Sequence, residues 1–137
     1  MAPAHPHACI IGSDQVAVVD GRVIGKPGSF DAARAQLLLI RGRTVVFHTA
    51  LCLLSTATGD CQLEDIPTTV RLREYTQSQA ERYAELERPY DCAGSAKIEA
   101  LGIALVEHVE SRDPTALIGL PLIALVSMLK NAGVEIL

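Results

Sequence analysis

The sequence predicts a single domain of α/β class with a mixed β-sheet and flanking helices. Its 137 residues suffice for one domain and are too few for two. Apolar residues make up 49% and charged residues 20%, which allows a buried core and argues against general disorder. Along the chain, β-branched segments and hairpin turns alternate with capped helical segments. Residues 1–137 are therefore treated as one domain.

The first elements predicted are two strands of a hairpin. Residues 9–19 are apolar and β-branched, apart from the polar run Ser13-Asp14-Gln15. Asp20-Gly21 is a strong hairpin turn signal, and residues 22–24 can form the return strand.

A helix and a longer strand are predicted next. Ser29 or Asp31 can cap a helix that runs to about Ile40, and Gly42 ends it. Residues 44–56 are rich in Val, Phe, Thr and Leu, which is typical of a strand.

The middle of the chain predicts a strand and a polar helix. A turn at 58–60 precedes a strand over 61–73, whose second half alternates apolar and polar residues. Thr76 and Gln79 have the spacing of a capping box, so a helix is expected from there to about Glu87.

The last third predicts mostly short elements. Residues 89–94 are expected to be irregular, residues 103–109 to form a strand and residues 113–114 a turn. A final helix is predicted over 120–131, with Pro121 in its first turn.

Charge and hydropathy exclude several classes of function. The net charge of −4, with 4% aromatic residues and no Trp, offers neither a basic field nor stacking platforms for nucleic acid. Residues 1–12 lack the basic residues of a signal peptide. The longest apolar run, 116–129, is too short to span a bilayer and predicts a buried helix. We therefore expect a cytoplasmic protein without nucleic-acid or membrane partners.

The four cysteines predict buried, reduced thiols rather than a disulfide framework or a zinc site, because no C-x-x-C pair occurs. They are Cys9, Cys52, Cys61 and Cys92. Cys92 invites a thiol-nucleophile hypothesis, but no motif links it to His48 or His108.

Three segments could carry chemistry, and each has a plain alternative. Asp14 is either a general base or metal ligand at a strand end, or an acid that simply faces water. The run Gly25-Lys26-Pro27-Gly28 before a helix is either a phosphate-binding loop or a turn, and it lacks the P-loop spacing. Residues 90–99 are either a functional loop or a solvated one.

These segments, in this order, resemble the Maf family of nucleoside triphosphate pyrophosphatases. The resemblance extends from about residue 8 to the end of the chain. It rests on residues 10–16, 25–28, Thr49, 89–95, 97–103 and 117–122. The forms S-D-Q at 13–15 and D-C-A-G…K-x-E at 91–99 resemble the branch that hydrolyses 7-methyl-GTP to its monophosphate and pyrophosphate.

The resemblance implies a role for each matched residue. Asp14 matches the acid regarded as the proton acceptor, Gln15 and Glu99 match positions that set base preference, and Lys26 matches a lysine at the phosphate end. It also implies an elongated fold, a homodimer, and a divalent cation, Mg²⁺ or Mn²⁺. The residues that bind the cation are unknown from the sequence, and Asp14 is a possible ligand by its position at a strand end.

The resemblance also implies family parts that would precede this sequence. Family members begin with a strand, a Ser-Pro-x-Arg-Arg-like loop and a helix, and a Glu and a Lys thought to help with metal and phosphate lie there too. A fragment, a mis-set start codon and a shortened paralogue are three explanations. The alternative function is an inactive nucleotide-binding or regulatory remnant that acts through its dimer surface. We also expect residues 8–16 to form a buried strand with one bare, association-prone edge.

Overall fold

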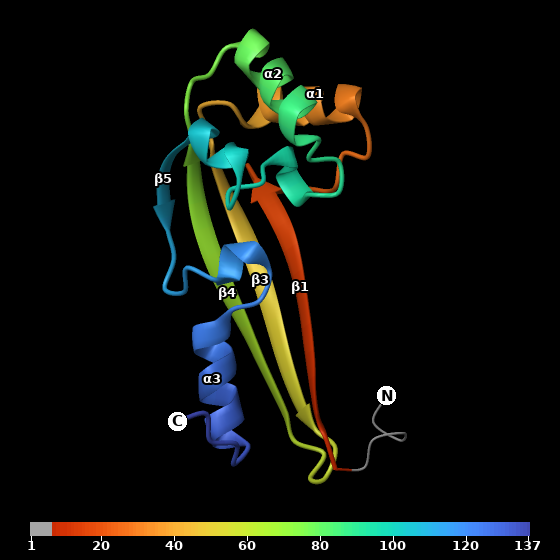
Figure 1. Cartoon of the computed structure of the whole chain (residues 1–137), viewed down its shortest axis with the longest axis vertical. Helices are drawn as coiled ribbons and strands as arrows, with labels where there is room; N and C mark the ends of the chain where they lie inside the picture. The colour runs from red at the N-terminus through yellow and green to blue at the C-terminus, as the bar shows by residue number, and fades with distance from the viewer. Residues whose placement is uncertain (1–6) are drawn as a thin grey trace.

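The computed structural model is an elongated, twisted β-sheet with helices at both ends (Figure 1). The structure describes residues 7–137. The first half of the segment over 1–12, which is expected not to be a signal peptide, lies outside the described residues. The strand order is β2-β1-β3-β4-β5. The α/β class is confirmed. The expected mixed sheet is not seen, because every pairing between described strands is antiparallel. The β1–β2 and β3–β4 connections are short hairpins, which join antiparallel strands. The β1–β3 and β4–β5 pairs are antiparallel although longer segments that contain helices connect them.

The predicted hairpin is confirmed as β1 (Cys9–Val19) and β2 (Arg22–Ile24). Asp20 and Gly21 have φ angles of 49° and 75°, as a two-residue turn that follows the twist of the strands requires. β2 pairs only with residues 17–19 of β1. Within residues 7–137, the rest of β1 therefore has a partner strand on one side only, β3.

The prediction of a buried strand over 8–16 is wrong. Ile11 and Val16 are 45% and 39% exposed, and residues 11–14 are all exposed. The apolar sequence pattern indicated a strand correctly, but burial depends on neighbours, and among residues 7–137 this half of β1 has a neighbouring strand on one edge only. Within the described residues the other edge is bare, as expected, and its tendency to associate stays a prediction.

Two helices pack together at one end of the sheet (Figure 1). In α1 (Phe30–Ile40) the cap is Ser29, whose hydroxyl accepts from Ala32 N at 3.2 Å. In α2 (Gln77–Glu87) the predicted capping box of Thr76 and Gln79 is present. The aliphatic core under these helices includes Leu37, Ile40, Val45, Val70, Leu72 and Leu105.

The long strands are confirmed as β3 (Thr44–Ser55) and β4 (Cys61–Leu72), but the next strand is shifted. Residues 101–105 form a 3-10 turn, and β5 covers only Val106–Glu110. The turn brings Gly102 against the backbone of Lys97, where an added Cβ would lie 2.4 Å from the Lys97 carbonyl oxygen. That close approach sets the turn, and the strand pattern did not reveal it.

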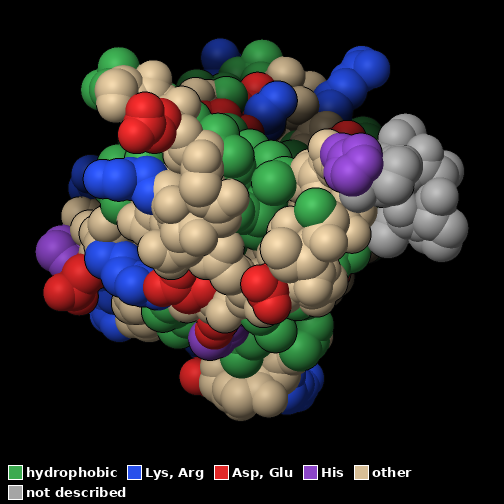
Figure 2. Space-filling model, turned by 90° about the horizontal axis from the view of Figure 1, so that it is seen from below, with side chains coloured by type: hydrophobic (Ala, Val, Ile, Leu, Met, Phe, Trp, Pro, Cys, Tyr) green, Lys and Arg blue, Asp and Glu red, His purple; other side chains and the backbone are tan. Residues whose placement is uncertain are grey.

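The apolar run over 116–129 is two elements, not one buried helix. A 3-10 turn (Ala116–Ile118) ends at Gly119, and α3 (Leu122–Asn131) follows, with Pro121 just before its first residue. One face of α3 is exposed, with Leu122 and Ile123 at 47% and 56%. Figure 2, which views the molecule from this end, shows hydrophobic side chains at the surface. In the described part of the chain no helix has the length and hydropathy to cross a membrane.

A remote loop caps the start of α3, since Pro121 offers no capping side chain. Asp113 Oδ2 accepts from Ile123 N at 2.9 Å, and Thr115 Oγ1 accepts from Leu122 N at 2.8 Å. Asp113 Oδ1 also accepts from Thr115 N at 2.9 Å. Burial alone raises the pKa of Asp113, but the hydrogen bonds from Thr115 and the helix backbone outweigh it and lower the pKa.

We predict that Asp113→Asn lowers the free energy of unfolding by about 2–3 kcal/mol near neutral pH, because a buried, charge-assisted cap is lost. A lowered folded-state pKa stabilises the fold above the unfolded value and is lost as pH falls through the folded value. The difference in free energy of unfolding between wild type and variant should therefore shrink as the pH falls below 3.8, the ordinary pKa of Asp. Urea unfolding across this range measures it, with exposed Asp31→Asn as control. A gap under about 0.5 kcal/mol would contradict the cap.

Candidate functional site

The four predicted site residues lie around one pocket of about 300 Å³. Asp14 and Gln15 come from β1, Lys26 from the loop between β2 and α1, and Glu99 from the loop after α2. The turn over 117–119 closes another side of the pocket. Segments far apart in sequence thus bring together the residues that were predicted to act together. The volume of the pocket lies at the lower end of the range for small-molecule sites.

Hydrogen bonds hold the Lys26 loop and the loop over 90–99 together. Gln36 of α1 donates from Nε2 to the Gly25 carbonyl at 3.0 Å, and its Oε1 accepts from the Ser95 hydroxyl at 2.5 Å. Gly28 N donates to the Tyr90 carbonyl at 2.8 Å. Lys26 is exposed on this braced loop and lines the pocket. Residues 25–28 form an irregular loop rather than a regular turn, and this loop places Lys26 at the pocket.

The side chain of Gln15 has one orientation that its surroundings allow. Its Nε2 donates to the carbonyls of Ala116 and Leu117 at 3.2 and 3.1 Å and to Thr49 Oγ1 at 3.0 Å. Thr49 Oγ1 itself donates to the Ala116 carbonyl, so all three neighbours are acceptors for Gln15. Its Oε1 accepts no hydrogen bond from any described residue. The amide therefore offers an acceptor to a ligand.

Asp14 is exposed, as the plain alternative for this residue predicted. Its Oδ1 accepts from Gln15 N at 2.9 Å, and it lines the pocket beside Ser13. Ser13 donates to the Gly119 carbonyl at 2.7 Å and so fixes this part of β1 against the turn over 117–119. The carboxylate combines solvent access with a place at the pocket, and both are needed to accept a proton from water.

The loop over 90–99 is anchored to the core and is not simply solvated. Tyr83 of α2 is buried, and its hydroxyl accepts from Lys97 N at 2.8 Å. Burial raises the pKa of Tyr83 to about 12, against the lowering effect of that hydrogen bond. Gly94 adopts a φ of 74° within the loop. The anchor holds Lys97 and Glu99, both exposed, at the pocket rim.

The charged residues of the pocket fit a divalent cation in part. Three acids, Asp14, Asp91 and Glu99, face two lysines, Lys26 and Lys97, so the lining carries an excess of one negative charge. A polyphosphate would need further positive charge there. No three His, Cys, Asp or Glu side chains cluster for a metal among residues 7–137. Mg²⁺ commonly uses only one or two carboxylates plus substrate phosphates, and the lining offers that many.

The cysteines differ from the expectation of buried thiols. Cys9 and Cys61 are exposed, Cys52 and Cys92 are partly exposed, and all four are free. Burial first, then the nearby Asp91, raises the pKa of Cys92, which disfavours the thiolate. Neither His48 nor His108 lines the pocket. His48 Nδ1 instead lies 2.9 Å from Asp65 Oδ2. The structure gives the thiol-nucleophile hypothesis no support.

Sequence reasoning missed the residues that position the others. Nothing in the helical pattern of 30–40 distinguishes Gln36, the link between the two loops. Asp113 was assigned only to a turn, yet it organises the segment whose carbonyls hold Gln15. The Asp-Pro-Thr order there is a known local capping arrangement and was the one available signal.

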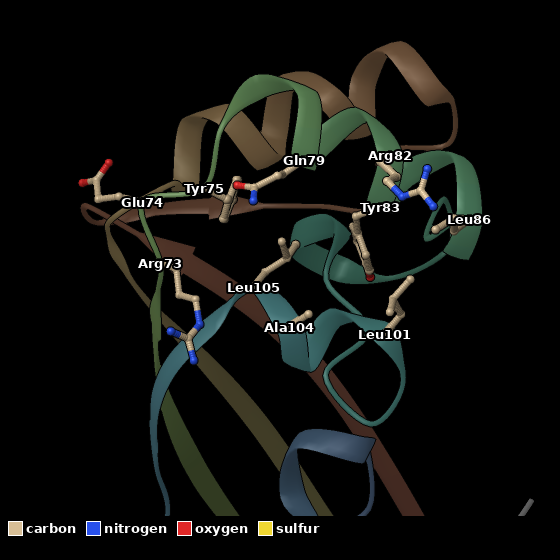
Figure 3. A pocket seen from close by; sticks show the side chains of 10 residues that line it. All are labelled: Arg73, Glu74, Tyr75, Gln79, Arg82, Tyr83, Leu86, Leu101, Ala104 and Leu105. Atoms are coloured by element: carbon tan, nitrogen blue, oxygen red, sulfur yellow. The ribbon is translucent and has the colours of Figure 1, made fainter.

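A larger hollow of about 430 Å³ lies elsewhere, between α2 and the turn over 101–105 (Figure 3). Arg73 and Arg82 stand at its ends, while the Glu74 carboxylate points away from it (Figure 3). Tyr75 and Tyr83 form part of its wall, and burial raises the pKa of both. It contains none of the predicted site residues and no acid directed inward, so we assign the candidate site to the smaller pocket.

Comparison with known proteins identifies the family of the chain. The family described as Maf-like protein matches residues 1–132. A protein named 7-methyl-GTP pyrophosphatase from Cupriavidus pinatubonensis is 61% identical over 133 residues, covering 97% of this chain and 67% of that protein. Proteins of the same name from Thiobacillus denitrificans and Pseudomonas fluorescens are 56% and 52% identical over 136 residues, covering 99% of this chain and 68% and 71% of those proteins.

The chain therefore belongs to the Maf family. It spans about two thirds of the length of these relatives. The family and its α/β fold, both predicted from the sequence, are confirmed.

Proposed function

We propose that this chain is a nucleoside triphosphate pyrophosphatase that hydrolyses 7-methyl-GTP to its monophosphate and pyrophosphate. The observation that carries the proposal is the convergence of Asp14, Gln15, Lys26 and Glu99 on one pocket from three separate segments. Relatives at 52–61% identity that are named 7-methyl-GTP pyrophosphatase support the same substrate.

The base is proposed to bind between Gln15 and Glu99. Methylation at N7 makes guanine cationic and strengthens its N1–H and N2–H donors. The free Oε1 of Gln15 and the carboxylate of Glu99 are acceptors that match these donors. The negative charge of Glu99 also complements the charged ring.

The triphosphate is proposed to extend toward Lys26, which supplies a point charge. A divalent cation, Mg²⁺ or Mn²⁺, would neutralise phosphate oxygens, with Asp14 and Asp91 as the residues to hold it. Water attacks the α-phosphorus, the bond to the β-phosphate bridging oxygen breaks, and pyrophosphate leaves. Asp14 accepts the proton that the attacking water releases.

Pyrophosphate release from 7-methyl-GTP and from GTP, each with Mg²⁺, with Mn²⁺ and with a chelator, tests the proposal. We expect faster release from 7-methyl-GTP and loss of release with the chelator. Equal rates for both nucleotides would reject the methylated substrate. Absence of release from every nucleotide, despite measurable binding, would reject turnover.

That last outcome is the second candidate, nucleotide binding without turnover. The pocket favours it in one respect, since its lining holds two lysines and no arginine for a triphosphate. Calorimetric titration with 7-methyl-GTP separates this candidate from a chain that does not bind at all. The homodimer, the cytoplasmic location and the single-domain organisation stay predictions, and sedimentation equilibrium tests the first.

A further inference from the structure

We infer that Cys52 and Cys61 form an intrachain disulfide when the protein meets a disulfide oxidant of the glutathione type. Their sulfur atoms lie 3.0 Å apart, across the end of the β3–β4 hairpin that is remote from α1 and α2 (Figure 1). Both thiols are free in the structure. The inference does not depend on the proposed function.

The strand register places the two thiols on one face. Cys52 is opposite Leu63 and Cys61 is opposite Leu54, so the cysteines are diagonal neighbours on that face. A disulfide bond of about 2.05 Å needs the sulfur atoms to approach by about 1 Å. Leu54 and Cys61 are the last residue pair before the connecting loop, where the hairpin can shift most easily.

The surroundings leave the pair accessible and separate from the other thiols. Cys61 is exposed and Cys52 partly exposed, and Gly12, opposite Cys52 on β1, puts no side chain over it. Cys9 is opposite Ser55, one position from Leu54, and so faces the other side of the sheet. Cys92 lies in the loop after α2.

The exchange balances in two steps. The Cys61 thiolate attacks oxidised glutathione, forms a mixed disulfide and releases one glutathione thiolate. The Cys52 thiolate then attacks Cys61 Sγ and releases the second glutathione, and the two cysteine protons end on the two glutathione thiols. Cys61 reacts first because it is more exposed, and because its hydrogen bond to Cys52, followed by burial, raises the pKa of Cys52.

The test uses the full chain with Cys9→Ser and Cys92→Ser, so that only the pair remains. After incubation in glutathione redox buffer, acid quenching, alkylation and trypsin, residues 44–71 form one peptide that contains both cysteines. We expect this peptide to be lighter than its reduced form by two hydrogen atoms, and dithiothreitol to restore the two alkylation sites. A peptide with two alkylated cysteines, or with two glutathiones, would overturn the inference.

Two controls connect the disulfide to the folded geometry. Cys52→Ser in the same background should leave Cys61 as a mixed disulfide with glutathione, with no closure. The ratio of closed to open peptide should be at least about tenfold higher for the folded chain than in concentrated urea, because the fold raises the effective thiol concentration. Equal ratios would contradict placement by the sheet. If oxidation of the wild-type chain joins Cys61 to Cys9 instead of Cys52, the proposed pairing would also be overturned.

Discussion

Asp14→Asn is expected to lower kcat/KM for pyrophosphate release by about 10²–10⁴-fold, the usual contribution of a positioned general base. An amide cannot accept the proton that the attacking water loses, whereas its size preserves the packing of β1. Because Asp14 is exposed and its Oδ1 contacts only the neighbouring Gln15 N, the substitution should leave the fold intact. Steady-state release of pyrophosphate from 7-methyl-GTP measures the effect.

The control is Asp31→Asn, which removes another exposed acid, from α1 and outside the pocket. It should leave kcat/KM unchanged within about twofold. Unfolding curves and nucleotide titration of Asp14→Asn establish that folding and binding survive. A loss of under about threefold would remove Asp14 from the role of proton acceptor.

Local chemistry explains which elements could be predicted. Asp20-Gly21 fixes a two-residue turn by backbone conformation alone, and Thr76 with Gln79 caps α2 through contacts three residues apart. Such signals lie within one stretch of sequence, so the sequence shows them directly. The 3-10 turn at Gly102 depends on the backbone of Lys97 across a loop, and the strand pattern of 103–109 carries no trace of it.

Burial was predicted less well than secondary structure, for the same reason. Apolar residues at 9–16 predicted a buried strand, but only β3 lies beside that part of β1 within the described residues. The run over 116–129 is apolar except for Ser127, yet Gly119 and Pro121 divide it and one face of α3 meets solvent. Hydrophobicity indicates what a residue favours, and the neighbours supplied by the fold decide whether it is buried.

The sequence predicted which residues form the candidate site, but not the contacts that hold them in place. The resemblance named Asp14, Gln15, Lys26 and Glu99, and the pocket brings them together. The supports of these residues, Gln36 and Asp113, act largely through hydrogen bonds to backbone carbonyls and amides of distant segments. Any residue type offers such backbone partners, so apart from the Asp-Pro-Thr order at 113–115 no motif indicates these contacts.

Glu99→Gln is expected to lower kcat/KM for 7-methyl-GTP about ten- to a hundredfold more than for GTP. The carboxylate can accept from N1–H and the N2 amino group together, and its charge complements the cationic ring of the methylated base. Glutamine keeps one acceptor and loses the charge. Charge-assisted hydrogen bonds contribute about 1.5–3 kcal/mol, which corresponds to that discrimination.

The quantity to measure is the ratio of the two kcat/KM values before and after substitution, since the ratio cancels any loss of folded protein. Glu85→Gln, at an exposed position of α2 outside the pocket, is the matched control and should leave the ratio unchanged. Gln15→Ala should shift the ratio less, because the Oε1 it removes is neutral and accepts one hydrogen bond from either base. If Glu99→Gln leaves the ratio unchanged, Glu99 does not contact the base, and the preference for the methylated nucleotide must come from another part of the protein.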